Sequence, residues 1–374
     1  MAPRATTIVS LLLGLVLTLL LSWQLFCQHD LAAVLSHGSH IILGVDGGSS
    51  VSLHSPDDDD ASSAALQLQL CGSHGFGIYK PRSHRRRKVY DLIMVNTELD
   101  MLELRLHTLH EHVDYFIIVE SPKTFQGADK NLTVLDSWAR FGRYHDKMFH
   151  HRLVFPRRWS PRRAWDSEDL QRDAMYEQVF PLLARQGGLR GPALGDVLLV
   201  SDVDEIPRPE TVDVLRACAF PRRTTLASRF YYYSFQNLHS GPEWHHPQAT
   251  FYQGWRTLRP TNLRNGDGGL PFLRDREKAS MRNASWHCSS CFGTMEGFLN
   301  KMASFSHTWM NGEEFRHRER IADAVRRGVD VWGREGDRFT RVERNEDVPA
   351  PLREGRFGYM LDRDGESAGF SDYP

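Results

Sequence analysis

The sequence predicts an α/β fold with a mostly parallel central sheet, preceded by a single transmembrane helix. Short, continuously apolar runs alternate with segments whose apolar residues recur at helical spacing, which is typical of buried parallel strands joined by helices. A long uncharged stretch near the amino terminus indicates the membrane helix. The formal net charge of -1 excludes a protein that relies on overall basicity to hold nucleic acid, so no nucleic-acid partner is expected.

Residues 8–27 are predicted to form a transmembrane signal anchor. The chain carries no charge from Ile8 to Phe26, and a helix of that length, at about 1.5 Å per residue, matches the hydrocarbon thickness of a bilayer. A cleaved signal peptide is the alternative, but the apolar core is long for one and no small-x-small cleavage site follows. Arg4 before the stretch and Asp30 after it favour a cytosolic tail at residues 1–7 and a lumenal location for the remainder.

Beyond this helix the chain divides into a stem, a globular domain and a tail. Residues 28–88 are expected to form a lumenal stem, because Gly, Ser and charged runs such as Arg85–Lys88 cannot bury enough apolar area to fold alone. Residues 89–343 have the alternating texture of a folded domain. Residues 344–374 are again polar and are expected to form a polar C-terminal tail that frays.

Two glycosylation sequons and four cysteines agree with a lumenal, oxidising location. The sequons begin at Asn131 and Asn283. The cysteines that follow the apolar stretch are disulfide candidates, and the sequence leaves their pairing open. They are Cys71, Cys218, Cys288 and Cys291.

Polar residues follow the expected strands of the globular domain. Strands are predicted at residues 89–95, 115–119, 151–155 and 197–200, with helices between them. Ligands of such sheets bind at the carboxyl ends of the strands. The residues placed there by the sequence are Asn96, Glu98, Glu120, Asp202 and Asp204.

The run Ser201-Asp202-Val203-Asp204-Glu205 is the sharpest chemical feature. Asp202 and Asp204 lie two residues apart where a buried strand gives way to a loop, so both carboxylates can turn to one face. Carboxylate oxygens with water and phosphate suit Mn²⁺ or Mg²⁺. The alternative is that these carboxylates only end the strand or cap the next helix.

Several motifs resemble glycosyltransferase family 17. They are YDLIMVNTELDMLELRLHTL from Tyr90, the later VDYFIIVES, the pair Ala164-Trp165 with Gln171-Arg172-Asp173-Ala174, SDVDEIP, WHCSSCF, and FSHTW at Phe305–Trp309, and they extend over residues 89–330. The resemblance implies a GT-A-like nucleotide-sugar transferase fold. It further implies an inverting, metal-dependent transfer of GlcNAc from UDP-GlcNAc to a mannose of protein N-glycans in β-1,4 linkage. It carries over Asp202 and Asp204 as metal and diphosphate ligands. A type II membrane protein of the Golgi, with a lumenal catalytic domain, matches the layout of the chain.

An inverting transfer needs one carboxylate that takes the proton of the acceptor hydroxyl. Glu296, at the start of a helix, is the preferred candidate, and Glu205, beside the metal motif, is the second. His307 is a candidate third metal ligand. Further substrate contacts are expected from the strand-end residues Asn96, Glu98 and Glu120, from Arg172 and Asp173, and from the aromatic residue Trp286. Tyr231 to Tyr233, Trp244 and Trp255 are also candidate sugar contacts, although alternate tyrosines of a strand should face the core.

Three other functions compete with this hypothesis. A family 17 transferase could use a different glycan acceptor, and a membrane-anchored lectin could keep the fold without catalysis. A phosphatase could use the first Asp as a nucleophile, but the sequence offers no convincing set of phosphate-binding elements for it. The sequence does not determine the oligomeric state.

Overall fold

The structure is a computed structural model that describes residues 56–81, 84–185 and 190–374. Residues 57 to 374 form one compact unit. Up to the acidic motif its elements are α2 (Pro56–Gly72), β1 (Gly77–Ile78), β2 (Val89–Val95), α3 (Leu99–Leu109), β3 (Tyr115–Glu120), α4 (Thr133–Asp136), η1 (Trp138–Tyr144), β4 (Met148–Arg152), α5 (Ala164–Ala174), η2 (Met175–Val179), α6 (Phe180–Arg185) and β5 (Val197–Asp202).

The second half of the unit starts directly after that motif. Its elements are β6 (Glu205–Pro207), α7 (Pro209–Ala217), β7 (Cys218–Ala219), β8 (Arg223–Tyr232), β9 (Ser234–His239), β10 (Gln248–Phe251), α8 (Pro260–Arg264), η3 (Pro271–Leu273), β11 (Lys278–Ser289), α9 (Met295–Ser304), η4 (Thr308–Asn311), η5 (Glu313–Phe315), α10 (Arg318–Arg327), β12 (Phe339–Arg341), α11 (Ala350–Arg353) and η6 (Gly358–Met360).

The main sheet is mixed, so the prediction of a mostly parallel sheet is wrong. Its strand order is β12-β9-β8-β10-β5-β2-β3-β4, with β11 paired to β8 and β6. Strands β5, β2, β3 and β4 are parallel. Strand β10 is antiparallel to β5 and β8, and β9 is antiparallel to β8. Helical crossovers join the strands of the first half, which favours parallel pairing, whereas β8 and β9 are separated only by Tyr233 and pair as a hairpin.

The predicted membrane-spanning helix is also not part of the observed fold. The segment concerned, residues 8–27, lies outside the described residues. Among the residues that are described, no helix combines the length and the apolar character needed to cross a bilayer. The fold class is therefore corrected to a mixed α/β sheet whose described part contains no transmembrane helix.

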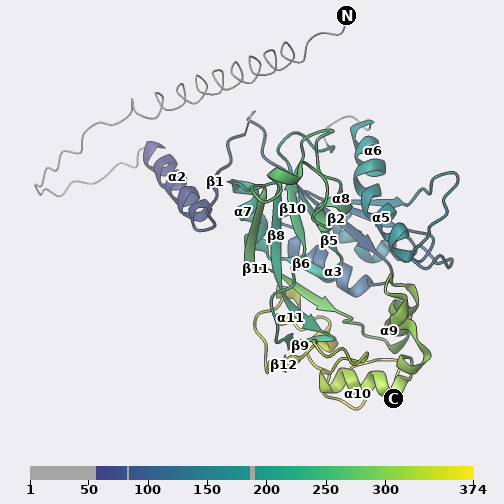
Figure 1. Cartoon of the computed structure of the whole chain (residues 1–374). Coiled ribbons are helices and arrows are strands. Elements are labelled where there is room, and N and C mark those ends of the chain that lie inside the picture. Colours follow the sequence, from purple (N-terminus) through teal and green to yellow (C-terminus); the bar gives the residue numbers. More distant parts are fainter. Residues whose placement is uncertain (1–55, 82–83, 186–189) are drawn as a thin grey trace, which may run out of the picture. The chain divides into compact units, whose positions relative to one another are not determined.

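The parallel strands are covered on both faces, as expected for continuously apolar strands. On one face, Ile93 and Leu199 pack in a cluster with Leu102 and Leu106 of α3 and with Leu215 of α7. On the other face, alternate residues of the same strands pack against α5, η2 and α6. Figure 1 shows α5 and α6 close together beside β2 and β5. Burial on both faces fixes the ends of these strands, and with them the polar residues that follow.

Residues 344–374, expected to fray, contribute to the core. Val348, Leu352 and Phe370 are buried, and Phe370 belongs to a third apolar cluster with Phe298 of α9. The buried Arg363 donates hydrogen bonds to the backbone carbonyls of Tyr233, Phe292 and Ala368. This segment packs despite its polar composition because its few apolar side chains and its one buried guanidinium all find partners.

The end of the predicted stem is likewise joined to the globular unit. Cys71, at the end of α2, is fully buried and forms a disulfide with Cys218, 147 residues away in sequence. Strand β1 pairs with β7 beside this bond. The second disulfide joins Cys288 to Cys291. The structure thus decides the pairing that the sequence left open.

Removing the Cys71–Cys218 disulfide should lower the free energy of unfolding. Such a long loop gains much entropy in the unfolded chain when the cross-link is lost, so we expect a cost of about 2–5 kcal/mol for Cys71→Ala/Cys218→Ala. Urea unfolding followed by tryptophan fluorescence measures it. The matched control is Cys288→Ala/Cys291→Ala. These cysteines are only three positions apart in sequence, so losing their disulfide should lower the free energy of unfolding by less. Equal costs for the two pairs would contradict this account.

Candidate active site

A cleft of about 470 Å³ lies at the carboxyl ends of the parallel strands. The register pairs Met94 with Asp202 and Val95 with Glu120, so these strands end at one edge. The charged residues that line the cleft are Glu98, Lys123, Lys130, Glu168, Asp169, Arg172, Asp202, Asp204, Glu205, Arg264, Lys301, Arg334 and Asp337. The cleft therefore has the position that open α/β sheets use for ligands, and it carries charges of both signs.

One buried guanidinium holds the acidic loop in place. Arg105 of α3 and Asp91 of β2 form a bidentate ion pair, and both side chains are fully buried. The same guanidinium donates to the Ser201 hydroxyl and to the backbone carbonyls of Asp202 and Glu205. Because the fork of donors in arginine is planar and rigid, these bonds fix the path of the backbone through the motif.

The Asp202 carboxylate faces two arginines. Arg172 Nη1 lies 2.9 Å from Oδ1, and Arg264 Nη2 lies 2.7 Å from Oδ2. Burial raises the pKa of Asp202, but these two guanidinium groups outweigh it and leave the pKa below its ordinary value. Arg172 is itself held by Glu168, 2.7 Å away on the same helix. Asp202 is thus a fixed anion between two fixed cations.

Glu205 is saturated with hydrogen-bond donors. Both of its oxygens accept from Arg264, and they also accept from the Trp244 indole N–H and the Asp202 backbone N–H. Burial opposes ionisation, yet Arg264 lowers the pKa of Glu205 well below its ordinary value. A carboxylate so occupied is poorly suited to take a proton from a substrate, and it serves instead to orient Arg264 and Trp244.

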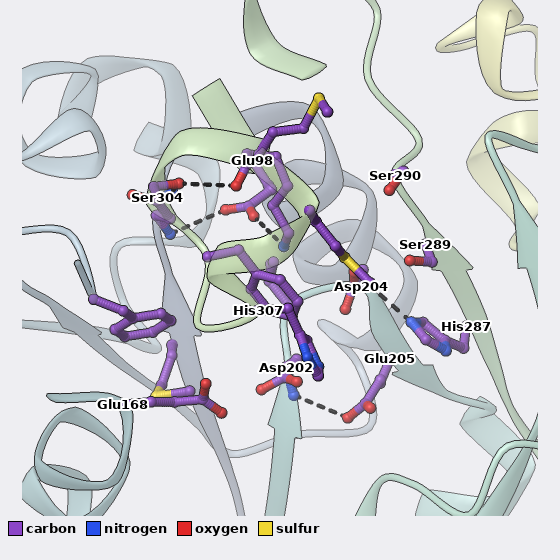
Figure 2. Close-up of a pocket in the computed structure, with 18 of the residues that line it drawn as sticks. Glu98, Glu168, Asp202, Asp204, Glu205, His287, Ser289, Ser290, Ser304 and His307 are labelled. Carbon is purple, nitrogen blue, oxygen red and sulfur yellow. Dashed lines mark hydrogen bonds and ion pairs between the residues drawn. The ribbon is translucent and has the colours of Figure 1, made fainter. Parts of the chain in front are cut away.

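Asp204 differs from both neighbours. Among the described residues its carboxylate accepts no hydrogen bond, and its nearest ionic contact is His287 Nε2, 3.8 Å from Oδ2. Figure 2 shows both residues on the cleft, joined by a dashed line. Partial burial lowers the pKa of the nearby Lys301, but the carboxylates of Glu98 and Asp204 raise the pKa further than burial lowers it. Asp204 therefore has oxygen lone pairs free for a ligand.

The predicted metal ligands do not form a closed set. Asp202, Asp204 and His307 all line the cleft. However, no three His, Cys, Asp or Glu side chains in the described part of the chain lie close enough to hold a cation by themselves. The His307 ring instead packs edge-on against Trp165, with ring centroids 5.0 Å apart.

The predicted substrate-binding residues are divided between the cleft and the interior. Asn96, Glu98 and Arg172 line the cleft. Glu120 is fully buried, and it accepts hydrogen bonds from Thr133 and His150. Glu120 lies at the predicted end of its strand, but its carboxylate oxygens are occupied by hydrogen bonds to these neighbours and are not available to a substrate.

Two further predicted contacts lie outside the cleft. Asp173 accepts a hydrogen bond from the Thr261 backbone N–H in the first turn of α8. Trp286 donates its indole N–H to Asp347. Because side chains alternate along a strand, it is the next residue, His287, that lines the cleft.

The preferred candidate base lies outside the cleft. Glu296 is exposed in the first turn of α9 and lines a second cavity of about 350 Å³, together with Asp100 and Arg140. Glu98 borders both cavities. Glu296 therefore does not share a cavity with Asp202 and Asp204.

Sequence reasoning missed several residues that line the cleft. They are Glu168, Asp169, His246, Arg264 and His287. Asp169 stands out because no hydrogen bond to its carboxylate is present among the described residues. Burial first, and the neighbouring Glu168 next, raise the pKa of Asp169. His287 was within reach of sequence reasoning, since it belongs to the quoted WHCSSCF motif, whereas α8 carries no pattern that would distinguish Arg264.

Aromatic rings form part of the cleft wall. Tyr232 and Trp244 line it, as do Phe230 and Trp332. All three tyrosines are buried: Tyr231 lies in one apolar cluster, and Tyr232 and Tyr233 lie together in another. Trp255 is 90% exposed and lies outside the lining. Flat apolar rings beside hydrogen-bonding groups are suited to sugar faces.

The two sequon asparagines are exposed. The Asn283 side chain accepts a hydrogen bond from Arg208, and its backbone has a φ of 50°. Glycosylation at Asn131 and Asn283 stays a prediction.

Comparison with known proteins shows the family to which this chain belongs. The model of glycosyltransferase family 17 matches residues 59–343, which include the sheet, the acidic loop and nearly the whole cleft lining. The chain belongs to glycosyltransferase family 17. The resemblance seen in the sequence motifs is thus confirmed, and the prediction of a glycosyltransferase is confirmed at the level of the family.

Several curated proteins are similar in sequence to this chain. It is 25% identical over 319 residues to the human protein named beta-1,4-mannosyl-glycoprotein 4-beta-N-acetylglucosaminyltransferase, an alignment covering 74% of this chain and 55% of that protein. The mouse protein of the same name is 26% identical over 281 residues, covering 65% and 48%. The chain therefore spans about half the length of the curated relatives it matches.

One solved structure matches part of this chain. It is the mannosyltransferase PcManGT from Pyrobaculum calidifontis in complex with GDP-Man and Mn²⁺, with 14% identity, coverage of 46% of this chain and 45% of that one, and a TM-score of 0.24. We draw nothing about this chain from so low a score.

Replacing Arg105 by Met should strongly destabilise the protein. The change leaves the Asp91 carboxylate buried without its partner, so we expect the free energy of unfolding to fall by about 3–5 kcal/mol in urea titrations. Arg140→Met is the matched control, because Arg140 pairs with Asp100 and Glu103 at the surface and should cost about 0–1 kcal/mol.

A double variant separates folding from function. Asp91→Leu/Arg105→Met removes both charges and should recover part of the lost stability. It should not restore glycosyltransferase activity, because the acidic loop has lost its donors. A double variant as active as the unmodified protein would refute the positioning role of Arg105.

Proposed function

We propose that this chain is an inverting, metal-dependent N-acetylglucosaminyltransferase that moves GlcNAc from UDP-GlcNAc to a mannose of protein N-glycans in β-1,4 linkage. The observation that carries the proposal is the Asp204 carboxylate, which is open to a cleft at the strand ends that also contains Arg172, Arg264 and Lys301. The names of the similar family members support the choice of donor, acceptor and linkage.

The donor diphosphate would bind beside the acidic loop. Arg172 and Arg264 are held in place by Glu168 and Glu205, so they need little reorganisation to face phosphate oxygens. Lys301 adds a third charge close to Asp204. Preorganised cations at this position stabilise the negative charge that UDP gains as it departs.

The residues present fit a divalent cation bound together with the donor. Mg²⁺ and similar ions are often held by one or two carboxylates plus substrate phosphates, so a three-ligand protein cage is not required. Asp204 has free carboxylate oxygens, whereas Asp202 would have to share its oxygens with the two arginines. Such an ion, when bound, would supply positive charge at the diphosphate.

Asp169 is the carboxylate that we assign as general base. It lines the cleft on α5, and none of the described arginines or lysines forms an ion pair with it. In the transfer, the acceptor hydroxyl oxygen forms a bond to the anomeric carbon of GlcNAc while the bond from that carbon to the diphosphate breaks. The hydroxyl proton passes to Asp169, and UDP leaves with the electron pair.

The aromatic wall would receive the sugars. Trp244 and Trp332 offer apolar faces, and Asn96, Ser289 and Ser290 offer hydrogen-bonding groups on the same cleft. This combination suits a pyranose, whose faces are apolar and whose rim carries hydroxyls.

We also propose that the protein works in the lumen of the Golgi. Two disulfides within the folded unit favour an oxidising compartment, and N-glycan acceptors occur there.

The proposed reaction is tested by release of UDP from UDP-GlcNAc in the presence of Mn²⁺. We expect release that depends on a biantennary N-glycan with terminal GlcNAc, and at least a hundredfold loss in Asp204→Ala. Asp213→Ala is the matched control, because Asp213 lies on the surface of α7 against His112. UDP release from UDP-GlcNAc that is the same with and without this glycan would indicate a different acceptor. A folded protein without turnover on any UDP-sugar would favour the lectin.

Replacing Asp169 by Asn should lower kcat by about 10²–10⁴-fold, with little change in the KM for UDP-GlcNAc. A general base must be ionised to accept a proton, so activity should fall as the pH drops through the pKa of Asp169. Because this pKa is raised, the loss in the unmodified enzyme should occur at a higher pH than for an aspartate with an ordinary pKa. The same helical run supplies a control, Glu177→Gln, at an exposed ion pair with Arg259. An unchanged kcat in Asp169→Asn would remove Asp169 from the mechanism.

A further inference from the structure

His287 is placed next to the acidic loop by backbone pairing. Strand β11 runs antiparallel to β6, with His287 opposite Glu205. The next residue, Cys288, donates its backbone N–H to the carbonyl of Asp204 over 3.1 Å. The histidine is therefore tied to the loop through the main chain, and its position does not depend on side-chain flexibility.

The imidazole ring is also fixed in orientation. Phe230 stacks on it, with ring centroids 4.8 Å apart and an interplanar angle of 13°. Trp244 packs against it as well, at 5.3 Å. Only 9% of the side chain is exposed. Figure 2 shows the edge of the ring turned toward Asp204.

Neither ring nitrogen of His287 has a hydrogen-bond partner among the described residues. Nδ1 is buried without one, and Nε2 lies 3.8 Å from Asp204 Oδ2. That distance is too long for a hydrogen bond. The Nε2 side of the ring, which lies next to Asp204 on the cleft, is therefore free to bind a ligand.

The separation of 3.8 Å is compatible with two ligand atoms on one metal ion. Oxygen and nitrogen ligands lie about 2.1 Å from small divalent ions, so two of them on one ion are at most about 4.2 Å apart. At a right angle they would be about 3.0 Å apart, which brackets the observed spacing. Asp204 Oδ2 and His287 Nε2 can thus bind the same cation.

We propose that His287 Nε2 is the second protein ligand of the divalent cation that binds with the donor, beside Asp204. This inference rests on the metal dependence stated under the proposed function. The imidazole nitrogen would shift the preference of the site from Mg²⁺ toward transition-metal ions, because Mg²⁺ favours oxygen ligands. Phosphate oxygens and water would complete the coordination.

The ligand can be identified spectroscopically in the full chain. With Mn²⁺ and UDP bound, electron spin echo envelope modulation should show coupling to a ¹⁴N nucleus of a directly bound imidazole. Labelling the histidines with ¹⁵N in the unmodified protein should replace that pattern with the one for ¹⁵N. This measurement needs no substitution, so it holds even if a variant fails to fold.

Substitutions then assign the nitrogen to a residue. His287→Gln should abolish the nitrogen coupling and weaken Mn²⁺ binding by about tenfold or more. His307→Gln is the matched control, a second cleft histidine whose loss should leave the coupling intact. Thermal unfolding without metal checks that both variants are folded.

The outcomes separate this inference from the proposed function. Mn²⁺ bound with UDP but without nitrogen coupling would overturn the role of His287 and leave metal-dependent transfer standing. Coupling that disappears in His307→Gln instead would also overturn it. UDP release from UDP-GlcNAc and glycan with no bound Mn²⁺ would overturn both the inference and the metal dependence.

Discussion

The ion pair between Arg105 and Asp91 is the interaction on which the site depends. It lies between α3 and β2, and both side chains are fully buried away from water. An isolated buried charge is very costly, so each partner requires the other. The guanidinium has donors left over, and these bind the backbone of the acidic loop. The same contact therefore stabilises the fold and shapes the loop that carries Asp202 and Asp204.

The loop then distributes its three carboxylates among different roles. Asp202 lies between Arg172 and Arg264, and Glu205 holds Arg264 and Trp244. Asp204 alone of the three faces the cleft without a hydrogen bond from the described residues. Asp202 and Asp204 are two positions apart, yet the oxygens of Asp202 are occupied by arginines and those of Asp204 are free to bind a ligand. The difference arises because residues from other segments of the chain contact one carboxylate and not the other. The two arginines that restrain Asp202 also line the cleft.

Much of the fold and part of the site could be predicted. The apolar strands predicted at 89–95, 115–119 and 197–200 follow from hydrophobic pattern, and the position of the polar residues after them follows from parallel-sheet geometry. In the structure the last two strands extend to Glu120 and Asp202. The pairing in the second half could not be predicted in this way. Strands β10 and β11 carry no signal of which strand they pair with, and β11 runs parallel to β8 but antiparallel to β6. Trp286 was chosen where His287 lines the cleft, because an aromatic side chain at a strand position does not reveal its face.

The sequence by itself determined the family and the position of the acidic motif at a strand end, since both depend on local order along the chain. Only the tertiary structure decided that Arg264, 62 residues from Asp202, would hold that carboxylate, and that Cys71 would pair with Cys218. It also placed His287 beside Asp204. Such contacts join segments that are distant in sequence, and their energies come from burial and charge in three dimensions, which no local pattern records.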